Sequence, residues 1–236
     1  MSTKTRDGIK AYNPLSLKLY DWWVLRVSNR YAWKCATERH LIPHFRNNMK
    51  NNHLDVGVGT GYYLTFTPDF CTISLMDLNI SSLEAANARV GRGRVKESIL
   101  HDVFNPYPPH LREQFDSVSM FYLLHCLPGE MHDKAEVIAH ASAALTKEGR
   151  LFGATILGDD AGHNMFGRKL MNIYNKKGIF SNRTDSAEAL ASLLSRYFHD
   201  VEITVEGKVA LFKAERKKLV RRITDDTLNP GCDNSP

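Results

Sequence analysis

The stretch HLDVGVGTGYYL, residues 53–64, constrains the fold of this chain more than any other. Its short apolar run at residues 54–56 is followed by three glycines with one residue between each pair, Gly57, Gly59 and Gly61. Glycine tolerates positive φ, and without a Cβ it lets a ligand approach the backbone closely. The stretch therefore predicts a strand that enters a tight turn, with a helix following from about Thr60.

Strand and helix patterns alternate after this turn. Runs rich in apolar residues predict further strands at residues 71–79, 94–100, 115–124 and 149–157. Between and after these strands, apolar residues at helical spacing predict three helices. The first begins at a capping pair, Ser81 and Glu84, and the second covers residues 131–145. The third begins at a capping pair, Asp185 and Glu188. Gly91 is expected to end the first of these helices.

The alternation predicts an α/β fold with a Rossmann-like, seven-stranded, mostly parallel sheet covered on both faces. The last two strands, DVEITV at 200–205 and KVALFKA at 208–214, are joined at Glu206 and Gly207, which indicates an antiparallel hairpin. In open sheets of this kind, ligands bind beyond the carboxyl ends of the strands. The residues at those ends are therefore the candidates for function.

Residues 1–50 are expected to form an N-terminal helical cap. Asn13-Pro14 is a typical helix start, and Tyr20, Trp23, Val24 and Val27 then form one apolar face. A second helix is expected over 32–45, interrupted near Pro43. The core domain would cover 51–215, with a long insertion at 158–184 as a substrate lid, and the polar residues 216–236 would form a disordered tail.

Composition places few demands on the function. The net charge of +5 is mild and is concentrated in the run ERKKLVRR at 215–222. No apolar run reaches the ~20 residues of a membrane span, and no apolar segment follows the N-terminal charges as in a secretory signal. The four cysteines, Cys35, Cys71, Cys126 and Cys232, are far apart, which is typical of unlinked thiols in a reducing compartment, and no metal is expected. We therefore expect a cytoplasmic protein.

The glycine turn fits neither common phosphate pattern. The dinucleotide fingerprint would have a third glycine where this chain has Tyr62, and the phosphate-binding loop with its lysine is absent. Two acids suggest a nucleoside instead. Asp77 ends the second strand, where it can accept from both ribose hydroxyls, and Asp102 follows the third, where it can accept from an adenine amino group with the Val103 backbone at the ring edge. Taken singly, each acid would be an ordinary exposed carboxylate or helix cap.

Four segments in order, LDVGVGTGYYL, LMDLN, LHDVF and FDSVSMFYLLHCLP, resemble the cofactor motifs of class I S-adenosylmethionine-dependent methyltransferases. The hairpin DVEITVEGKVALFKA is similar to the last two strands of that family. The resemblance covers residues 54–214 and implies S-adenosyl-L-methionine as the cofactor, with S-adenosyl-L-homocysteine as its product. It says little about the substrate.

The resemblance also implies roles for individual residues. The methionine portion of the cofactor would be framed by Asp55 and the three glycines of the turn, Gly57, Gly59 and Gly61. Asp77 would hold the ribose with Leu78 against the adenine, and Asp102 and Val103 would hold the adenine edge. Phe121 would line the floor near the sulfonium. Two tyrosines would close over the amino acid end, Tyr12 and Tyr20, although Tyr20 suits core packing equally well.

His125, in FYLLHCLPG, is the best-placed candidate for a general base, because it closely follows the fourth strand and histidine titrates near neutral pH. The alternative is a structural histidine at a helix start, hydrogen-bonded to the backbone. As a methyl sulfonium is already activated, the enzyme mainly has to align a nucleophile with the methyl group and exclude water.

The insertion at 158–184 mixes apolar and polar residues, which favours a small-molecule substrate. No aromatic-basic platform for a nucleic acid is visible. The sequence thus predicts a small-molecule methyltransferase acting at O, N, S or an activated carbon, in specialised metabolism. Two alternatives stay open: a methyltransferase acting on RNA or protein, with the basic tail as a docking element, and a non-methylating protein that only binds the cofactor. The oligomeric state is not predicted.

Overall fold

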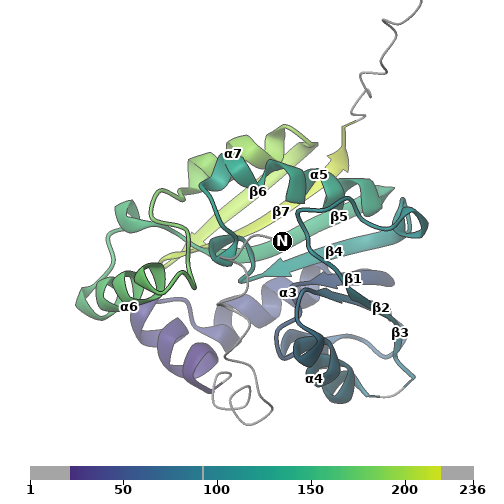
Figure 1. Cartoon of the computed structure of the whole chain (residues 1–236), viewed down its shortest axis with the longest axis horizontal. Coiled ribbons are helices and arrows are strands. Elements are labelled where there is room, and N and C mark those ends of the chain that lie inside the picture. The colour runs from purple at the N-terminus through teal and green to yellow at the C-terminus, as the bar shows by residue number, and fades with distance from the viewer. Residues whose placement is uncertain (1–21, 92, 219–236) are drawn as a thin grey trace, which may run out of the picture.

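The computed structural model describes residues 22–91 and 93–218, which form a seven-stranded sheet in the order β3-β2-β1-β4-β5-β7-β6 (Figure 1). Its strands are β1 (Asn52–Val56), β2 (Thr72–Asp77), β3 (Val95–Leu100), β4 (Phe115–Phe121), β5 (Leu145–Ile156), β6 (Phe198–Glu206) and β7 (Val209–Lys217). All pairs among β1 to β5 are parallel, whereas β7 runs antiparallel to β5 and β6. The predicted mostly parallel sheet with a terminal hairpin is confirmed.

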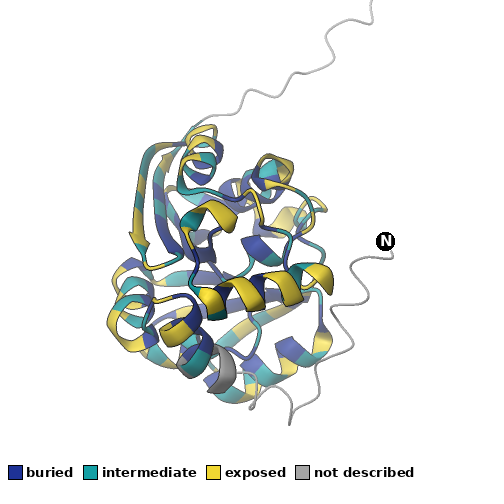
Figure 2. Ribbon diagram, turned by 90° about the vertical axis from the view of Figure 1, so that its left-hand side faces the viewer, coloured by how far each residue is buried: buried dark blue, intermediate teal, exposed yellow. Residues whose placement is uncertain are grey.

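Helices cover both faces of the sheet. One apolar cluster joins the sheet to α5 (Ala135–Ala144) and α7 (Ala187–Ser195). A second joins the opposite face to α3 (Ile42–Asn48), α4 (Ile80–Val90) and α6 (Met165–Lys176). The alternation along β7 shows the two faces directly, since its residues belong in turn to the second cluster (Val209, Leu211) and to the first (Ala210, Phe212). Figure 2 shows the matching pattern of buried inner and exposed outer helix surfaces.

The described part of the N-terminal region is helical but is interrupted at a different place from the one predicted. The π-helix η1 (Trp22–Ala32) ends before a non-helical stretch at 33–36, in which Lys34 has a φ of +55°, and the π-helix η2 (Thr37–Leu41) then continues directly into α3. The break predicted near Pro43 is wrong, because Pro43 lies in the first turn of α3, where the bonding pattern changes from π to α and a missing N–H is tolerated. The start predicted at Asn13-Pro14 lies outside the described residues.

Two predicted helix starts are also wrong. α4 is capped by Asn79, whose side chain accepts from the Ser81 N–H at 2.9 Å, so the helix begins before Ser81. Similarly, the cap of α7 is Ser186, while Asp185 forms an ion pair with Lys134. Each true cap lies within two residues of the cap-forming residue that was predicted, which is why composition alone did not separate them. α4 ends at Val90, followed by Gly91 with φ +99°, as predicted.

The segments after β1 and β4 are more irregular than expected. Only a single 3-10 turn, η3 (Tyr63–Phe66), replaces the helix predicted from Thr60. Further 3-10 turns are η4 (Pro109–Leu111), η5 (Leu124–Cys126), η6 (Met131–Lys134) and η7 (Asp159–Ala161). The helix predicted over 131–145 is divided between η6 and α5, and its last residue, Leu145, already begins β5.

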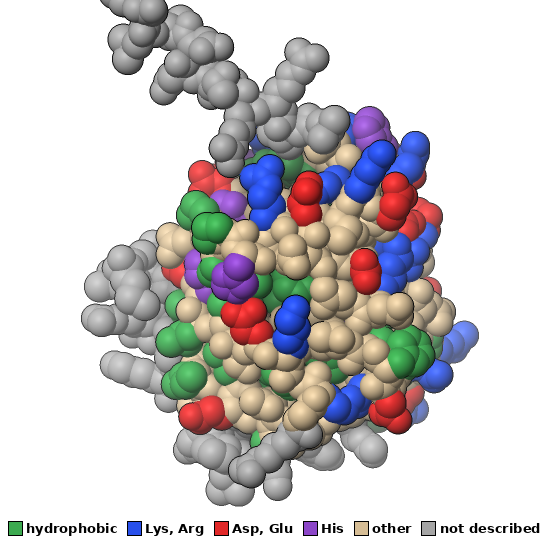
Figure 3. Space-filling view, turned by 90° about the vertical axis from the view of Figure 1, so that its right-hand side faces the viewer, with side chains coloured by type: hydrophobic (Ala, Val, Ile, Leu, Met, Phe, Trp, Pro, Cys, Tyr) green, Lys and Arg blue, Asp and Glu red, His purple; other side chains and the backbone are tan. Residues whose placement is uncertain are grey.

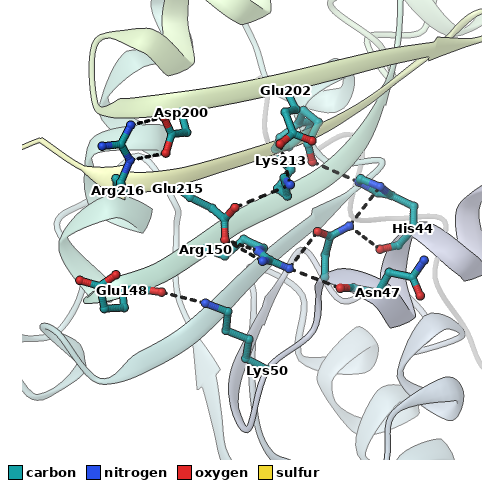
Figure 4. A network of polar contacts seen from close by, with 12 residues as sticks. His44, Asn47, Lys50, Glu148, Arg150, Asp200, Glu202, Lys213, Glu215 and Arg216 are labelled. Atoms are coloured by element: carbon teal, nitrogen blue, oxygen red, sulfur yellow. Dashed lines mark hydrogen bonds and ion pairs between the residues drawn. The ribbon is translucent and has the colours of Figure 1, made fainter.

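A polar network fixes α3 on the sheet (Figure 4). Nε2 of His44 lies 3.1 Å from the carbonyl oxygens of both Gly153 on β5 and Phe212 on β7. Its Nδ1 lies 3.2 Å from the amide of Asn48, which in turn accepts from Arg150 at 3.1 Å. Burial lowers the pKa of His44, so the ring is neutral and its one N–H serves the two strand carbonyls.

Three thiols are free among the described residues, Cys35, Cys71 and Cys126. Burial raises the pKa of both Cys35 and Cys126 to about 12, so neither is a nucleophile near neutral pH. Cys232 lies outside the described residues. Within residues 22–91 and 93–218, no helix has both the length and the apolar character required to cross a bilayer.

Candidate active site

The predicted cofactor residues lie along the carboxyl edge of the parallel strands. Asp55 belongs to β1, Asp77 is the last residue of β2, Phe121 is the last residue of β4, and Asp102 follows β3 by two residues. Because β3, β2, β1 and β4 are neighbours in that order, residues that are up to 66 positions apart reach one edge. The fold therefore brings together the acids and the turn that the sequence predicted.

The three glycines of the turn all have positive φ, +74° for Gly57, +53° for Gly59 and +68° for Gly61. A Cβ on Gly57 would lie 2.9 Å from Leu123, and one on Gly61 would lie 2.8 Å from Ala86 of α4. These two glycines allow close packing of the turn against its neighbours. A Cβ on Gly59 would have no neighbour within 4 Å among the described residues. As far as residues 22–91 and 93–218 are concerned, the middle of the turn therefore has room for a ligand, which fits a cofactor bound at this edge.

Asp77 is held in one orientation beside this turn. Its Oδ1 accepts from the Asn79 N–H at 2.8 Å, and its Oδ2 lies 3.4 Å from the N–H of Gly59. Burial raises its pKa, whereas these backbone N–H groups lower it. The backbone N–H groups of Leu78 and Val58 also lower its pKa, so four backbone N–H groups face the carboxylate and a ligand hydroxyl would share its oxygens with them.

Asp102 and Val103 are less open than predicted, because part of their hydrogen-bonding capacity is already used. Oδ1 of Asp102 accepts from the Phe104 N–H at 3.1 Å. The Val103 carbonyl lies 3.1 Å from Nδ1 of His140 on α5. The second oxygen of Asp102 and the Val103 N–H are the groups left for an adenine. Leu78 is partly exposed next to Asp77, as contact with a ring would require.

Phe121 is 8 % exposed and belongs to an aromatic cluster rather than to an open floor. Its ring centroid lies 4.7 Å from that of Tyr63 and 5.3 Å from that of Phe45. The next residue, Tyr122, has φ +58°, which is unusual for a residue with a side chain and is typical of functional sites. Its hydroxyl donates to Oδ1 of Asn29 at 2.9 Å, which links the end of β4 to η1.

His125 is 2 % exposed in η5. Its Nδ1 accepts from the Ile156 N–H at 3.3 Å and lies 3.3 Å from Oγ1 of Thr155. Burial, and then the charge of Lys134, lower its pKa to about 3. The ring is thus neutral with its proton on Nε2, which makes it a donor. These contacts match the structural alternative and weigh against the general-base role, which stays a prediction.

Asp55 ends a buried hydrogen-bonded series that sequence reasoning missed. Its Oδ1 accepts from the Ser119 hydroxyl, and Oγ of Ser119 lies 3.0 Å from Nε2 of His53. Burial raises the pKa of Asp55 to about 7, the Ser119 hydroxyl lowers it, and the charge of Asp77 raises it. A signal was present in the sequence, because His53 and Asp55 are two residues apart and therefore share one face of β1.

Part of the predicted lid lies close to His125. The Phe180 ring centroid is 4.5 Å from the His125 centroid, and the Ser181 N–H donates to the His125 carbonyl at 2.8 Å. Other lid residues belong to the core instead, since Leu170 and Met171 of α6 are buried in the second cluster. Tyr12 and Tyr20 lie outside the described residues. Within the described ranges, no group of three metal-ligating side chains is present.

Comparison with known proteins finds methyltransferases that are similar to this chain. A methyltransferase-domain family model matches residues 54–151. YbcY of Escherichia coli (strain K12) is 58% identical over 192 residues, which cover 81% of this chain and 99% of YbcY. The physcion biosynthesis cluster O-methyltransferase of Aspergillus chevalieri is 44% identical over 92% of this chain and 98% of its own length. N-methyltransferase vrtF of Penicillium aethiopicum is 38% identical over 79% of each chain.

Solved structures share the fold at low identity. An O-methyltransferase family protein from Burkholderia thailandensis superimposes with a TM-score of 0.62 at 16% identity, over 91% of this chain and 63% of that one. NcsB1 of neocarzinostatin biosynthesis, solved with S-adenosyl-L-homocysteine and a dihydroxynaphthoic acid, gives 0.58 at 14% identity, over 86% and 59%. The strand order, the glycine turn and the relatives agree: this chain is a class I S-adenosylmethionine-dependent methyltransferase of the small-molecule type.

Proposed function

We propose that the carboxyl edge of β1, β2 and β3 binds S-adenosylmethionine and that the enzyme methylates an oxygen atom of a small molecule. The observation that carries the cofactor site is the pair Asp77 and Asp102 at the carboxyl ends of the neighbouring parallel strands β2 and β3, with Asp77 3.4 Å from the N–H of Gly59 in the glycine turn. The relatives named as O-methyltransferases support oxygen as the acceptor. A relative named as an N-methyltransferase makes nitrogen the second candidate.

In this proposal each acid has a separate task. Asp77 accepts from the ribose hydroxyls with Leu78 against the adenine, and Asp102 with the Val103 N–H binds the adenine edge. Asp55 and the glycine turn face the methionine end, with Phe121 below it. Tyr12 and Tyr20 would close this end from the N-terminal cap at 1–50.

When bound, S-adenosylmethionine supplies a methyl group that is already activated by its sulfonium. The chain therefore has to bind, orient and exclude water rather than generate a reactive group. Phe180 and Ser181 of the lid contact His125, and Asn29 of η1 contacts Tyr122. We infer that the lid and η1 together form the wall of the acceptor site, in which His125 offers its Nε2–H as a hydrogen-bond donor.

Cofactor binding tests the proposed site most directly. Asp77→Asn is expected to weaken S-adenosylmethionine binding about 10- to 100-fold, because a hydrogen bond to a charged group contributes about 1.5–3 kcal/mol. Titration calorimetry at pH 8 measures this dissociation constant, with Asp69→Asn as the control because Asp69 is fully exposed. If the wild-type protein gave no heat, or if Asp77→Asn bound as tightly, the assignment of this edge would be wrong.

His125→Ala is expected to lower kcat at least tenfold and to change the dissociation constant of the cofactor little, since His125 faces the lid rather than the glycine turn. His125→Asn is the matched variant, because its side-chain oxygen can still accept from the Ile156 N–H while its amide keeps a donor. We expect His125→Asn to retain most of the turnover if a donor is what matters. If His125 were a general base, both variants would lose turnover to the same extent. If His125→Ala turned over as fast as the wild type, His125 would have no part in the mechanism.

Two other functions can be separated from this proposal. An enzyme for RNA would show a steep dependence of substrate binding on salt, but basic and acidic side chains are interspersed on the face drawn in Figure 3. A protein that binds the cofactor without methylating anything would never convert it to S-adenosylhomocysteine. Mass spectrometry of the bound ligand, followed by a screen of metabolites for a gain of one methyl group, distinguishes these cases and identifies the acceptor.

A further inference from the structure

A continuous line of hydrogen bonds runs through the core from the loop before β1 to the cofactor edge. The Lys50 N–H donates to Oγ of Ser117 at 2.9 Å, and that oxygen lies 2.8 Å from Nδ1 of His53. Nε2 of His53 lies 3.0 Å from Oγ of Ser119, whose hydroxyl contacts Oδ1 of Asp55. We call this series the His53 chain. It crosses from β1 to β4, since His53 pairs with Ser117 and Asp55 with Ser119 in the sheet register.

The His53 chain is isolated from solvent. The side chains of His53, Ser117 and Ser119 are 0 % exposed, and Asp55 is 6 % exposed. The His53 ring lies between aromatic neighbours, with centroid distances of 5.8 Å to both Phe45 and Phe152. Because water does not compete at these positions, each proton in the chain has to be donated to one of these protein partners.

The direction of the chain follows from its two ends. A backbone N–H can only donate, so Ser117 accepts from Lys50 and passes its own proton to Nδ1 of His53. The neutral imidazole then has its proton on Nε2 and donates to Ser119. Ser119 donates in turn to Asp55, which accepts when it is ionised. Burial lowers the pKa of His53 to about 3, so the ring stays neutral, and above the Asp55 pKa of about 7 the order ends on an ionised carboxylate.

The opposite order is incomplete. If Asp55 were protonated and donated to Ser119, Ser119 would donate to Nε2 and His53 would carry its proton on Nδ1. Ser117 would then receive two N–H groups, from Lys50 and from His53, and its own proton would have no acceptor in the chain. The tautomer of His53 and the charge of Asp55 are therefore coupled over the length of the chain.

We infer that His53 and Ser119 are positioning residues that keep Asp55 ionised and aimed at the cofactor edge, so that it can bind the ammonium group of the amino acid end of the cofactor. This inference rests on the proposed cofactor site. It assigns a task to two residues that no sequence motif identified. It also predicts that cofactor binding depends on pH through Asp55, a buried carboxyl group.

The pH dependence has a definite sign. Asp55 has a pKa of about 7, so lowering the pH below 7 protonates it and weakens binding. Asp77 on β2 is the charged neighbour that acts on it, and His53 on β1 does not titrate in this range because its pKa is about 3. If the Ser119 hydroxyl is removed, the pKa of Asp55 rises further. Asp55 is then protonated at a higher pH, and cofactor binding begins to weaken at a higher pH than in the wild type.

The test compares Ser119→Ala and His53→Phe with the wild-type protein by titration calorimetry with S-adenosylmethionine from pH 6 to pH 9. At pH 7 we expect each variant to bind about tenfold more weakly, as one charge-assisted hydrogen bond is lost or disordered, and to recover most of its affinity at pH 9. His53→Gln, which keeps an amide donor toward Ser119, is expected to restore part of the affinity at pH 7. A variant that was merely misfolded would not recover at pH 9.

A second measurement tests the chain without any cofactor. In the free protein labelled with ¹⁵N-histidine, the His53 signals, assigned by their loss in His53→Gln, should report a proton on Nε2 at pH 8 and should shift as the pH falls through 7. Three results would overturn the inference. The first is a His53 proton on Nδ1, and the second is a pH-dependent shift of the His53 signals in Ser119→Ala as large as that in the wild type. The third is a cofactor affinity that neither variant changes at any pH. If the free protein shows the expected tautomer and the wild-type protein binds no cofactor, it is the proposed cofactor site that fails.

Discussion

Asp55→Asn is expected to make this protein more stable at pH 8 and to remove most of its cofactor binding. Burial raises the pKa of Asp55 from the ordinary value of 3.8 to about 7. The folded protein therefore holds this proton between those pH values while the unfolded chain releases it, so stability falls as the pH rises through this window. Above pH 7 the full cost of the buried charge is present, which at about 1.4 kcal/mol per pKa unit is on the order of 4 kcal/mol.

An asparagine has the size of the aspartate but carries no charge, so it removes much of this cost. We expect the free energy of unfolding at pH 8 to rise by about 2 kcal/mol, less than the full cost because the amide still has to be desolvated. The gain should shrink toward pH 4.5, where the carboxyl group is protonated in the folded wild type. Urea unfolding at pH 8, 6 and 4.5 measures it.

The same substitution removes the acceptor proposed for the ammonium group of the cofactor, so the dissociation constant at pH 8 is expected to rise about 10- to 150-fold. Asp69→Asn, at a fully exposed acid, should change neither quantity. A protein that lost stability at pH 8 on mutation to asparagine would show that Asp55 is not a strained buried charge. Such an outcome is informative because a purely structural aspartate is expected to lose stability on mutation.

Lys134→Met is expected to destabilise the protein by about 3–5 kcal/mol, because it leaves the buried charge of Asp185 without its partner. The two side chains are 0 % exposed and their Nζ and Oδ2 atoms are 2.8 Å apart. Nζ also donates to the Ser181 carbonyl at 3.2 Å. Burial raises the pKa of Asp185 and the charge of Lys134 lowers it, so the loss of the lysine favours a protonated, neutral Asp185.

The double variant Lys134→Met/Asp185→Leu should recover most of this loss, since a buried ion pair and an apolar pair of similar size often have similar stability. An exposed pair serves as the control: Glu202→Gln, which removes the partner of Lys213 at 2.8 Å (Figure 4), should cost less than 1 kcal/mol. Urea unfolding of the wild type and of these three variants measures the changes. A loss for Lys134→Met no larger than that for Glu202→Gln would contradict the role of this pair.

The ion pair between Lys134 and Asp185 also has a consequence for the proposed lid at 158–184. Ser181, whose carbonyl accepts from Lys134, donates its N–H to the His125 carbonyl. The loss of Lys134 therefore removes one of the contacts that hold residues 181–185 beside His125. We expect the effect on methyl transfer to exceed the effect on cofactor affinity, because the glycine turn lies on a different side of β4 from this contact.

The main features of the fold were predictable because they depend on local patterns. Apolar runs alternating with helical spacing specify a parallel sheet, and the hairpin at Gly207 specifies its antiparallel end. The acids Asp77 and Asp102 reach one edge because parallel strands always end on the same side. The caps at Asn79 and Ser186 were missed, since several cap-forming residues stand side by side and the choice among them depends on how the helix packs.

The sequence by itself determined which residues stand at the ends of the strands, because the alternation of strands and helices follows from the spacing of residues along the chain. Only the tertiary structure decided the state of those residues. The burial of His125 against Phe180, the partner of Asp185 and the direction of the His53 chain all depend on side chains from distant segments. The charge of a side chain and the position of its proton depend on the neighbouring side chains and on the exclusion of water. The spacing of residues along the chain specifies neither.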